Sequence, residues 1–356
     1  MKITKIEAVY PSYKESLRTW RPNLWQIVTK IHTDKKGVFG YGTGGGGNAS
    51  IEVINGHLSN FLLNKEINNL SDINNLFDKL FFESIPYGRA GLAMMAISSI
   101  DIAIWDAYSK YYETPIKNLL NDEKKHVKYI KTYATGNSVE NYYSLGINTF
   151  KLSIKSKDDF NNESKEIIKL INEIKTKFPN SKKIMIDCYM SWDREYTMKI
   201  SKQLADTGIE WIEDISTPDT MLLEDSMIGK LSGIKLAGGE HDFNFHNFEI
   251  MLKNRTYDIW QPDITWCGGI SSLLKIININ KKKYKIFLHR GGEPWGLPLI
   301  ESGVVDNMAE LHNPKSKKLQ MEQWNNKTIK SLEDGILITA DYLGFGSDPI
   351  KGLFND

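Results

Sequence analysis

The chain has 356 residues, too many for one small domain and enough for a barrel with a second module. Hydrophobic residues make up 41% and charged residues 25%, the ordinary range of soluble globular proteins. A formal net charge of +1 creates no field that would attract nucleic acid or an anionic membrane, so we expect neither partner.

Two features of the sequence indicate a cytoplasmic protein. The only cysteines, Cys188 and Cys267, lie far apart, which is typical of a reducing compartment without a disulfide framework. The first residues, Met1 to Glu7, are charged and strand-like, unlike a signal peptide. No apolar run approaches the roughly 20 residues that span a bilayer.

The chain begins with strand-like segments. Residues 2–10 and 26–33 alternate between apolar and polar side chains, and a return strand begins at Val38 after a turn. The glycine run 44–47 lacks both the Lys-Ser/Thr of a phosphate loop and the glycine spacing of a dinucleotide site. We therefore expect a three-stranded meander followed by a loop.

Helical periodicity replaces the alternation from Ile51 onward. Apolar residues recur at three- and four-residue steps over 51–62, 72–82 and 89–110, and the last of these segments is apolar on nearly all sides. We predict an α+β capping domain over residues 1–120, which ends before a charged turn.

Strands and helices alternate over the next two hundred residues. Four strand-like runs end in an acid and a fifth ends in a histidine, at intervals of 26, 27, 23 and 26 residues. Each interval suits one strand, one helix and two loops, the repeat of a barrel with its catalytic groups at the carboxyl ends of the strands. The five residues are Asp187, Glu213, Glu240, Asp263 and His289.

Three further apolar runs, 127–134, 148–154 and 307–311, bring the number of barrel strands to eight. The pattern predicts a modified (β/α)8 TIM barrel over 121–319. The remainder, 320–356, has too few apolar residues for a core of its own. We expect this C-terminal tail to pack back on the cap.

Three of the strand-end acids, Asp187, Glu213 and Glu240, predict a metal site. Hard oxygen ligands without a Cys or His set suit Mg²⁺, with Mn²⁺ as an alternative. Without a cation, three converging carboxylates would repel one another and at least one would take up a proton. Three unrelated surface acids are the competing interpretation, which the regular intervals disfavour.

Asp263 and His289 end neighbouring strands, so their side chains can meet. A carboxylate bonded to one ring nitrogen fixes the tautomer and raises the basicity of the other. A divalent cation beside such a base implies removal of the proton next to a metal-bound carboxylate. A buried histidine of the core is the competing interpretation for His289 alone.

Several motifs together resemble the mandelate racemase branch of the enolase superfamily, and within it most closely the L-rhamnonate dehydratases. A His base acting with Mg²⁺ is an established pattern of that superfamily. The matching segments run along nearly the whole chain and are Ala96–Asp106, Tyr133–Gly136, Met185–Ser191, Trp211–Glu213, Gly239–Asp242, Gln261–Gly269 and Ala309–Leu311.

The resemblance implies a role for each member of the site. It assigns Mg²⁺ to the three acids named above and makes His289 the base, oriented by Asp263. The remaining implied groups are Glu310, beside the carboxylate or its enediolate; Lys151, on the second barrel strand; and His241, as a polar substrate contact. The branch also commonly forms homo-oligomers.

The second barrel strand favours one reaction over another. Members of the branch that act from both faces carry Lys-x-Lys there, whereas this chain has Lys151-Leu-Ser153. Racemisation requires a base on each face, but a dehydration can use His289 alone. The pattern therefore favours a sugar-acid dehydratase that removes the C2 proton and the C3 hydroxyl to give a 2-keto-3-deoxy acid. Lys155 lies two residues further along and leaves a racemase or epimerase of a 2-hydroxy acid open.

The substrate loops depart from the L-rhamnonate dehydratases. Arg18 or Arg21 is expected to meet the acid from the first loop, and Arg290 and Trp295 stand where a Ser-rich loop is usual. L-Rhamnonate is the leading substrate. Galactonate, fuconate, arabinonate and xylonate are the alternatives, and a relative that captures an acid sugar without turnover is a further one.

Overall fold

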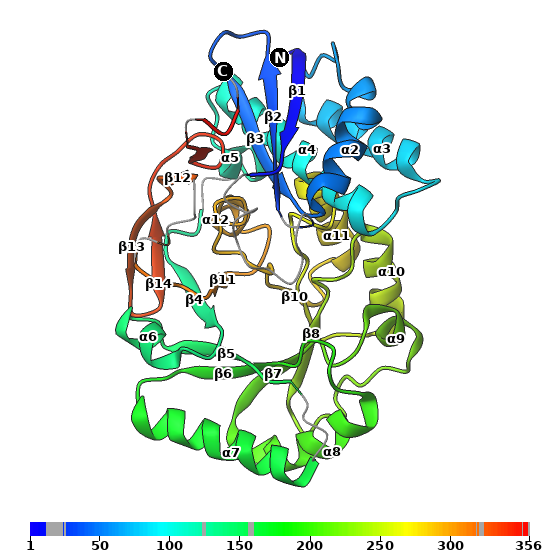
Figure 1. Cartoon of the computed structure of the whole chain (residues 1–356). Coiled ribbons are helices and arrows are strands. Elements are labelled where there is room, and N and C mark those ends of the chain that lie inside the picture. Colours follow the sequence, from blue (N-terminus) through cyan, green and yellow to red (C-terminus); the bar gives the residue numbers. More distant parts are fainter. Residues whose placement is uncertain are drawn as a thin grey trace.

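The computed structural model describes residues 1–11, 24, 26–122, 126–155, 160–317, 319, 324–350 and 352–354. A three-stranded sheet and its helices form one end of the molecule, and a ring of strands with outer helices forms the other (Figure 1). Both chain termini lie at the end that holds the three-stranded sheet (Figure 1).

The N-terminal sheet is an antiparallel meander with the order β1-β2-β3, as expected. Its strands are β1 (Ile3–Val9), β2 (Ile27–Thr33) and β3 (Phe39–Gly44). The helices that follow are α2 (Gly47–Gly56), η1 (Leu58–Phe61), α3 (Leu70–Ser84), α4 (Gly91–Tyr111) and α5 (Ile116–Leu120). The glycine run is therefore a tight passage from β3 into α2, not an open loop.

Glycines allow β3 to lie directly on the backbone of α4. A Cβ added to Gly40 would stand 2.0 Å from the carbonyl oxygen of Ala103, and one added to Gly42 would stand 2.0 Å from that of Ser99. Among the described residues, α4 alone is long and apolar enough to cross a membrane, but 89% of its apolar window is buried inside the protein. Its hydrophobicity is that of a core helix.

Eight parallel strands form the second unit. In hydrogen-bonded order they are β11 (Ala309–His312), β4 (Ile130–Thr135), β5 (Thr149–Ser153), β6 (Lys183–Asp187), β7 (Ile209–Glu213), β8 (Lys235–Gly238), β9 (Ile259–Trp260) and β10 (Lys285–Ile286). Between β10 and β11 the amide of Asp306 donates to Ile286 and that of Gly292 donates to Glu310. These bonds connect the two ends of the row, as a barrel requires.

Helices cover the outside of this ring. They are α6 (Val139–Ser144), α7 (Phe160–Lys177), α8 (Arg194–Leu204), η2 (Ala205–Thr207), α9 (Pro218–Leu223), α10 (Phe245–Asn254), α11 (Gly269–Asn280) and α12 (Leu297–Ser302). α7 and α8 lie outside β5, β6 and β7 at the foot of Figure 1. Together with the N-terminal unit they make the capped, barrel-like α/β architecture that the sequence predicts.

Two strands end earlier than expected. The strands β9 and β10 are each only two residues long, so Asp263 and His289 stand three residues beyond them. Pro262 has no amide hydrogen to donate to a neighbouring strand. The catalytic candidates therefore lie on loops at the rim.

The C-terminal segment contributes to both units. It holds β12 (Trp324–Asn326), β13 (Ile329–Glu333), β14 (Ile336–Thr339) and β15 (Ser347–Pro349). β14 pairs with the beginning of β4 in the barrel. Further along, the amide of Phe345 donates to Asp106 of α4 at 3.0 Å, so the last part of the chain returns to the cap as expected.

Asp101 connects the two units at the start of α11. Its carboxylate accepts bonds from the amide of Ser271 at 3.0 Å and from the hydroxyl of Ser271 at 2.5 Å. Burial raises the pKa of Asp101 to about 7, since hydrogen bonds alone do not replace the lost water.

This shift predicts a stability that depends on pH. The folded protein holds the Asp101 proton more tightly than the unfolded chain, whose pKa is about 3.9, so stability should fall as pH rises from about 4 to 7. Asp101→Asn removes that loss, and the stability of this variant relative to the parent should rise over this range by about 3 kcal/mol. Urea unfolding at several pH values measures it. A difference that does not change with pH would contradict the assignment.

Candidate active site

A cavity of about 640 Å³ opens at the carboxyl ends of the barrel strands. Its lining includes Asp187, Glu240 and His289 from the barrel and Gln26 from the N-terminal unit. A groove of about 810 Å³ along the outer side of α7 is larger, but its lining residues all belong to that one helix. The cavity at the strand ends, in contrast to this groove, gathers ionisable groups from several elements, as catalytic sites do.

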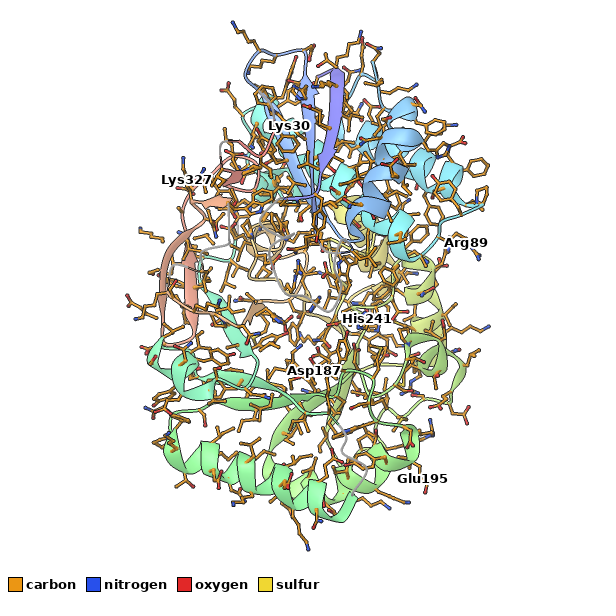
Figure 2. The ribbon with its side chains drawn as sticks, viewed as in Figure 1. Lys30, Arg89, Asp187, Glu195, His241 and Lys327 are labelled. Carbon is orange, nitrogen blue, oxygen red and sulfur yellow. The ribbon has the colours of Figure 1, made fainter. Side chains whose placement is uncertain are left out.

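The register of the sheet places two of the predicted metal ligands side by side. Asp187 at the end of β6 pairs with Glu213 at the end of β7. Glu240 follows β8 by two residues, and its pKa is raised to about 7 by burial and by the nearby charge of Asp187. Figure 2 shows Asp187 near the middle of the molecule, close to His241 in this view.

Lys151 joins two buried acids. Its ammonium group forms ion pairs with Glu213 and, at 2.9 Å, with Glu310, and all three side chains are at most 1% exposed. Burial alone would lower the pKa of Lys151, but the two carboxylates raise it well above its usual value. Lys151 therefore carries a positive charge between these two carboxylates.

Removing this cation should destabilise the fold. Lys151→Met leaves Glu213 and Glu310 buried without their partner, and such uncompensated charge typically costs about 3–5 kcal/mol of unfolding free energy. Chemical denaturation measures the loss. The matched control is Lys199→Met on the surface, whose bond to Glu195 should be worth less than about 1 kcal/mol. Equal losses in the two variants would contradict this account.

His289 and Asp263 form the expected pair. The ring nitrogen Nδ1 lies 2.8 Å from the Asp263 carboxylate, and Nε2 lies 3.2 Å from Glu240. Burial would lower the pKa of His289, but Glu240 and Asp263 raise it to about 9. Thr265 donates to the other oxygen of Asp263 at 2.7 Å through both its amide and its hydroxyl. The imidazole is thus oriented with Nε2 toward the acids.

Arg290 holds the loop after His289 against the cap. Its guanidinium donates to Glu293 at 2.9 Å and, with the amide of Gln26 turned to accept, to Gln26 at 3.0 and 2.6 Å. It also lies 3.9 Å from Asp263 and helps to lower the pKa of that acid despite burial. Arg290 thus lines the cavity, and both of its terminal amino groups bond to the protein.

Trp295 was expected to contact substrate, but it is 2% exposed and packs against Trp324. Its indole donates to Glu293 at 2.8 Å. Trp295 does not line the cavity, because its ring is buried against Trp324. Arg18 and Arg21 lie outside the described residues.

The structure also places Asp214, which sequence reasoning missed, beside the predicted residues Glu240 and His241. Each of the three offers a ligand atom, and these atoms lie within 4.8 Å of one another. His241 Nε2 is 3.2 Å from Glu240 and 3.8 Å from Asp214. The sequence could have indicated Asp214, because it directly follows the predicted metal ligand Glu213.

The end of β11 supplies another unexpected group. His312 lines the cavity together with Lys155 and Trp266. The regular spacing of the strand-end residues did not identify any of the three as a member of the site. His312 follows Glu310 by two residues on the same strand, so the two side chains face the same side. This alternation could have identified it.

The donor set suits a magnesium ion. Asp187, Glu213 and Glu240 offer only carboxylate oxygens, which Mg²⁺ prefers, whereas the group with His241 includes a nitrogen more typical of transition metals. Burial raises the pKa of Glu240. Burial and the negative charge of Glu240 raise the pKa of Asp214. Such unneutralised acids are what a bound cation would compensate.

Comparison with known families agrees with this geometry. Residues 18–121 match the model of the mandelate racemase / muconate lactonizing enzyme N-terminal domain, and residues 134–299 match that of the enolase C-terminal domain-like family. The two models cover the cap and most of the barrel in the order observed.

Individual proteins give the same picture. A protein of Caldivirga maquilingensis named "Putative L-rhamnonate dehydratase" is 29% identical over 305 residues, covering 85% of this chain and 75% of that protein. L-Rhamnonate dehydratase from Gibberella zeae superposes with a TM-score of 0.83 at 24% identity, covering 99% of this chain and 94% of that one. It has also been crystallised in complex with Mg.

A third similar structure is the 3,6-anhydro-D-galactonate cycloisomerase from Zobellia galactanivorans, with a TM-score of 0.82 at 25% identity over 98% of this chain and 97% of that one. The shared architecture extends over both units. The chain belongs to the enolase superfamily, in its mandelate racemase branch.

Proposed function

We propose that the protein is a Mg²⁺-dependent sugar-acid dehydratase. The observation that carries this proposal is the arrangement of one oriented base, His289, facing a group of buried acids across a single cavity. The dehydratases among its relatives support it. Asp187, Glu213 and Glu240 would hold the ion. When bound, it would hold the acid's carboxylate and make the C2 proton easier to remove.

His289 supplies the proton chemistry. Its Nε2 accepts the C2 proton while Asp263 holds Nδ1, which keeps the ring in one tautomer. The same nitrogen then donates to the C3 hydroxyl, which departs as water and leaves an enol that becomes the 2-keto-3-deoxy acid. A cation held by Glu240 would offset the charge that favours a protonated His289, and the ring could then act as a base.

Glu310 and Lys151 would complete the acid-binding side. The carboxylate of Glu310 accepts bonds from Thr135 and from the amide of Arg290, and Lys151 and His289 lower its pKa despite burial. We propose that Lys151 places fixed positive charge near the carboxylate of the substrate, and that His241 contacts the substrate from the other side. Both are contributions to binding and orientation.

A panel of aldonic acids tests the function directly. Each acid is incubated with Mg²⁺ and assayed for 2-keto-3-deoxy acid, with L-rhamnonate expected to give the largest kcat/KM among L-rhamnonate, galactonate, fuconate, arabinonate and xylonate. The product should be one water lighter than the substrate. Absence of keto acid from every member of the panel would refute the proposal.

A racemase or epimerase is the second candidate, because Lys155 lines the same cavity as His289. Its ammonium lies 4.9 Å from the ring centre of Tyr189, which lines the cavity as well. Lys155 follows the end of β5 by two residues. Incubation in heavy water separates the reactions. A racemase returns deuterated substrate of inverted configuration, whereas a dehydratase forms keto acid.

A further inference from the structure

A second cavity adjoins the one that holds the candidate site. It has a volume of about 550 Å³ and shares three lining residues with the first, namely Glu293, His312 and Asn313. We call these three residues the throat. The second cavity reaches Glu310 but is not lined by Asp187, Glu240 or His289, and it continues past His312 to residues 313–316.

Glu293 is held firmly in the throat. Its Oε2 accepts bonds from Arg290 at 2.9 Å and from the indole of Trp295 at 2.8 Å. Both bonds approach from the protein side, and among the described residues no hydrogen bond reaches Oε1. Arg290 also bonds to Gln26 and lies 3.9 Å from Asp263, on the side of the throat that faces the first cavity.

His312 stands on the other side of the throat at the end of β11. Its side chain is exposed to the cavity, and no hydrogen bond to its ring comes from the part of the chain that the structure describes. The concave surroundings, with His289 and Arg290 nearby, lower the pKa of His312 to about 4. A neutral ring offers one donor and one acceptor, which a sugar hydroxyl can use together.

We propose that Glu293 and His312 recognise a hydroxyl at the far end of the substrate and thereby select aldonates over aldarates. This rests on the proposed function and names its substrate class. A terminal hydroxyl can donate to Oε1 of Glu293 and bond to His312. A second carboxylate at that position would meet the fixed negative charge of Glu293 in a partly desolvated throat, where like charges repel strongly.

Binding of matched acids tests the inference apart from turnover. D-Gluconate and D-glucarate differ only at C6, as do D-galactonate and D-galactarate. Calorimetry with Mg²⁺ in a His289→Ala background gives the Kd of each acid. We expect each aldonate that binds to bind at least about tenfold more tightly than its aldarate, the effect of one charged contact.

Two variants of the throat locate the effect. Glu293→Gln keeps an acceptor for Arg290 and Trp295 but removes the charge, so the ratio of the two Kd values should fall by about tenfold. His312→Phe should weaken aldonate binding by about tenfold, and His312→Gln should restore most of it. The matched control is Glu195→Gln at the far end of the molecule, which should leave the ratio unchanged (Figure 2).

The inference is overturned if neither aldonate binds, if aldarates bind as tightly as aldonates, or if Glu293→Gln leaves the ratio unchanged. Failure of the proposed function would be distinct, since it would appear as absence of keto acid with the parent protein. A protein that dehydrates aldonates but shows no effect of Glu293→Gln on the ratio would retain the function and refute only the inference.

Discussion

His289→Ala should lower kcat by at least about 10⁴-fold, because one nitrogen both removes the C2 proton and returns it to the departing hydroxyl. General acid and base catalysis each contribute about 10²–10⁴-fold in other enzymes. Steady-state formation of keto acid from the best aldonate measures the loss. The cavity around His289 is lined by several other elements, so the fold should persist.

Two accompanying measurements make this result specific to the base. Mg²⁺ affinity should survive, since the three proposed ligands are elsewhere, and exchange of the C2 proton in heavy water should disappear together with turnover. Asp263→Asn should show a smaller loss, because Asn can still accept from Nδ1 but no longer carries a charge. Residual C2 exchange in His289→Ala would move the base to another residue, with Lys155 the first to test.

The intervals between strand ends were enough to predict the positions that matter most. A strand places its last side chains at one edge of the sheet, so regular spacing alone brought Asp187 beside Glu213. The pairing of His289 with Asp263 followed in the same way, although both residues lie on loops. The strands were predicted too long, but the two side chains still meet, because both loops continue past the rim in the direction of their strands.

The environment of a side chain was not predictable from spacing. Trp295 was expected at the substrate and is buried, because the path of the loop depends on packing against Trp324 some thirty residues later. His312 and Asp214 entered the site through β11 and through an unusual backbone angle, since Asp214 has a φ of +46°. Long-range packing and single left-handed residues leave little trace in a local pattern.

Replacing a proposed metal ligand should have the second large effect, on Mg²⁺ affinity and on turnover. Asp187→Asn should raise the Kd for Mg²⁺ by at least about 100-fold and abolish turnover at low Mg²⁺, because a neutral amide replaces one of three charged oxygen ligands. Calorimetric titration of the metal-free protein measures Kd. Chelation of the parent should likewise stop keto-acid formation, and added Mg²⁺ should restore it.

Asp214→Asn is the matched comparison, since Asp214 and Asp187 are acids of the same size at the ends of the neighbouring strands β7 and β6. Asp214 shares Glu240 with His241 in the alternative group of ligands. Because that group includes an imidazole nitrogen, it suits Mn²⁺ or zinc better than Mg²⁺. If the all-oxygen group holds the ion, Asp214→Asn should change the Mg²⁺ Kd by less than about threefold, well under the change from losing a charged ligand. A larger change in the Mg²⁺ Kd from Asp214→Asn than from Asp187→Asn would place the ion between Asp214, Glu240 and His241. Of these three ligands, His289 would then contact only Glu240.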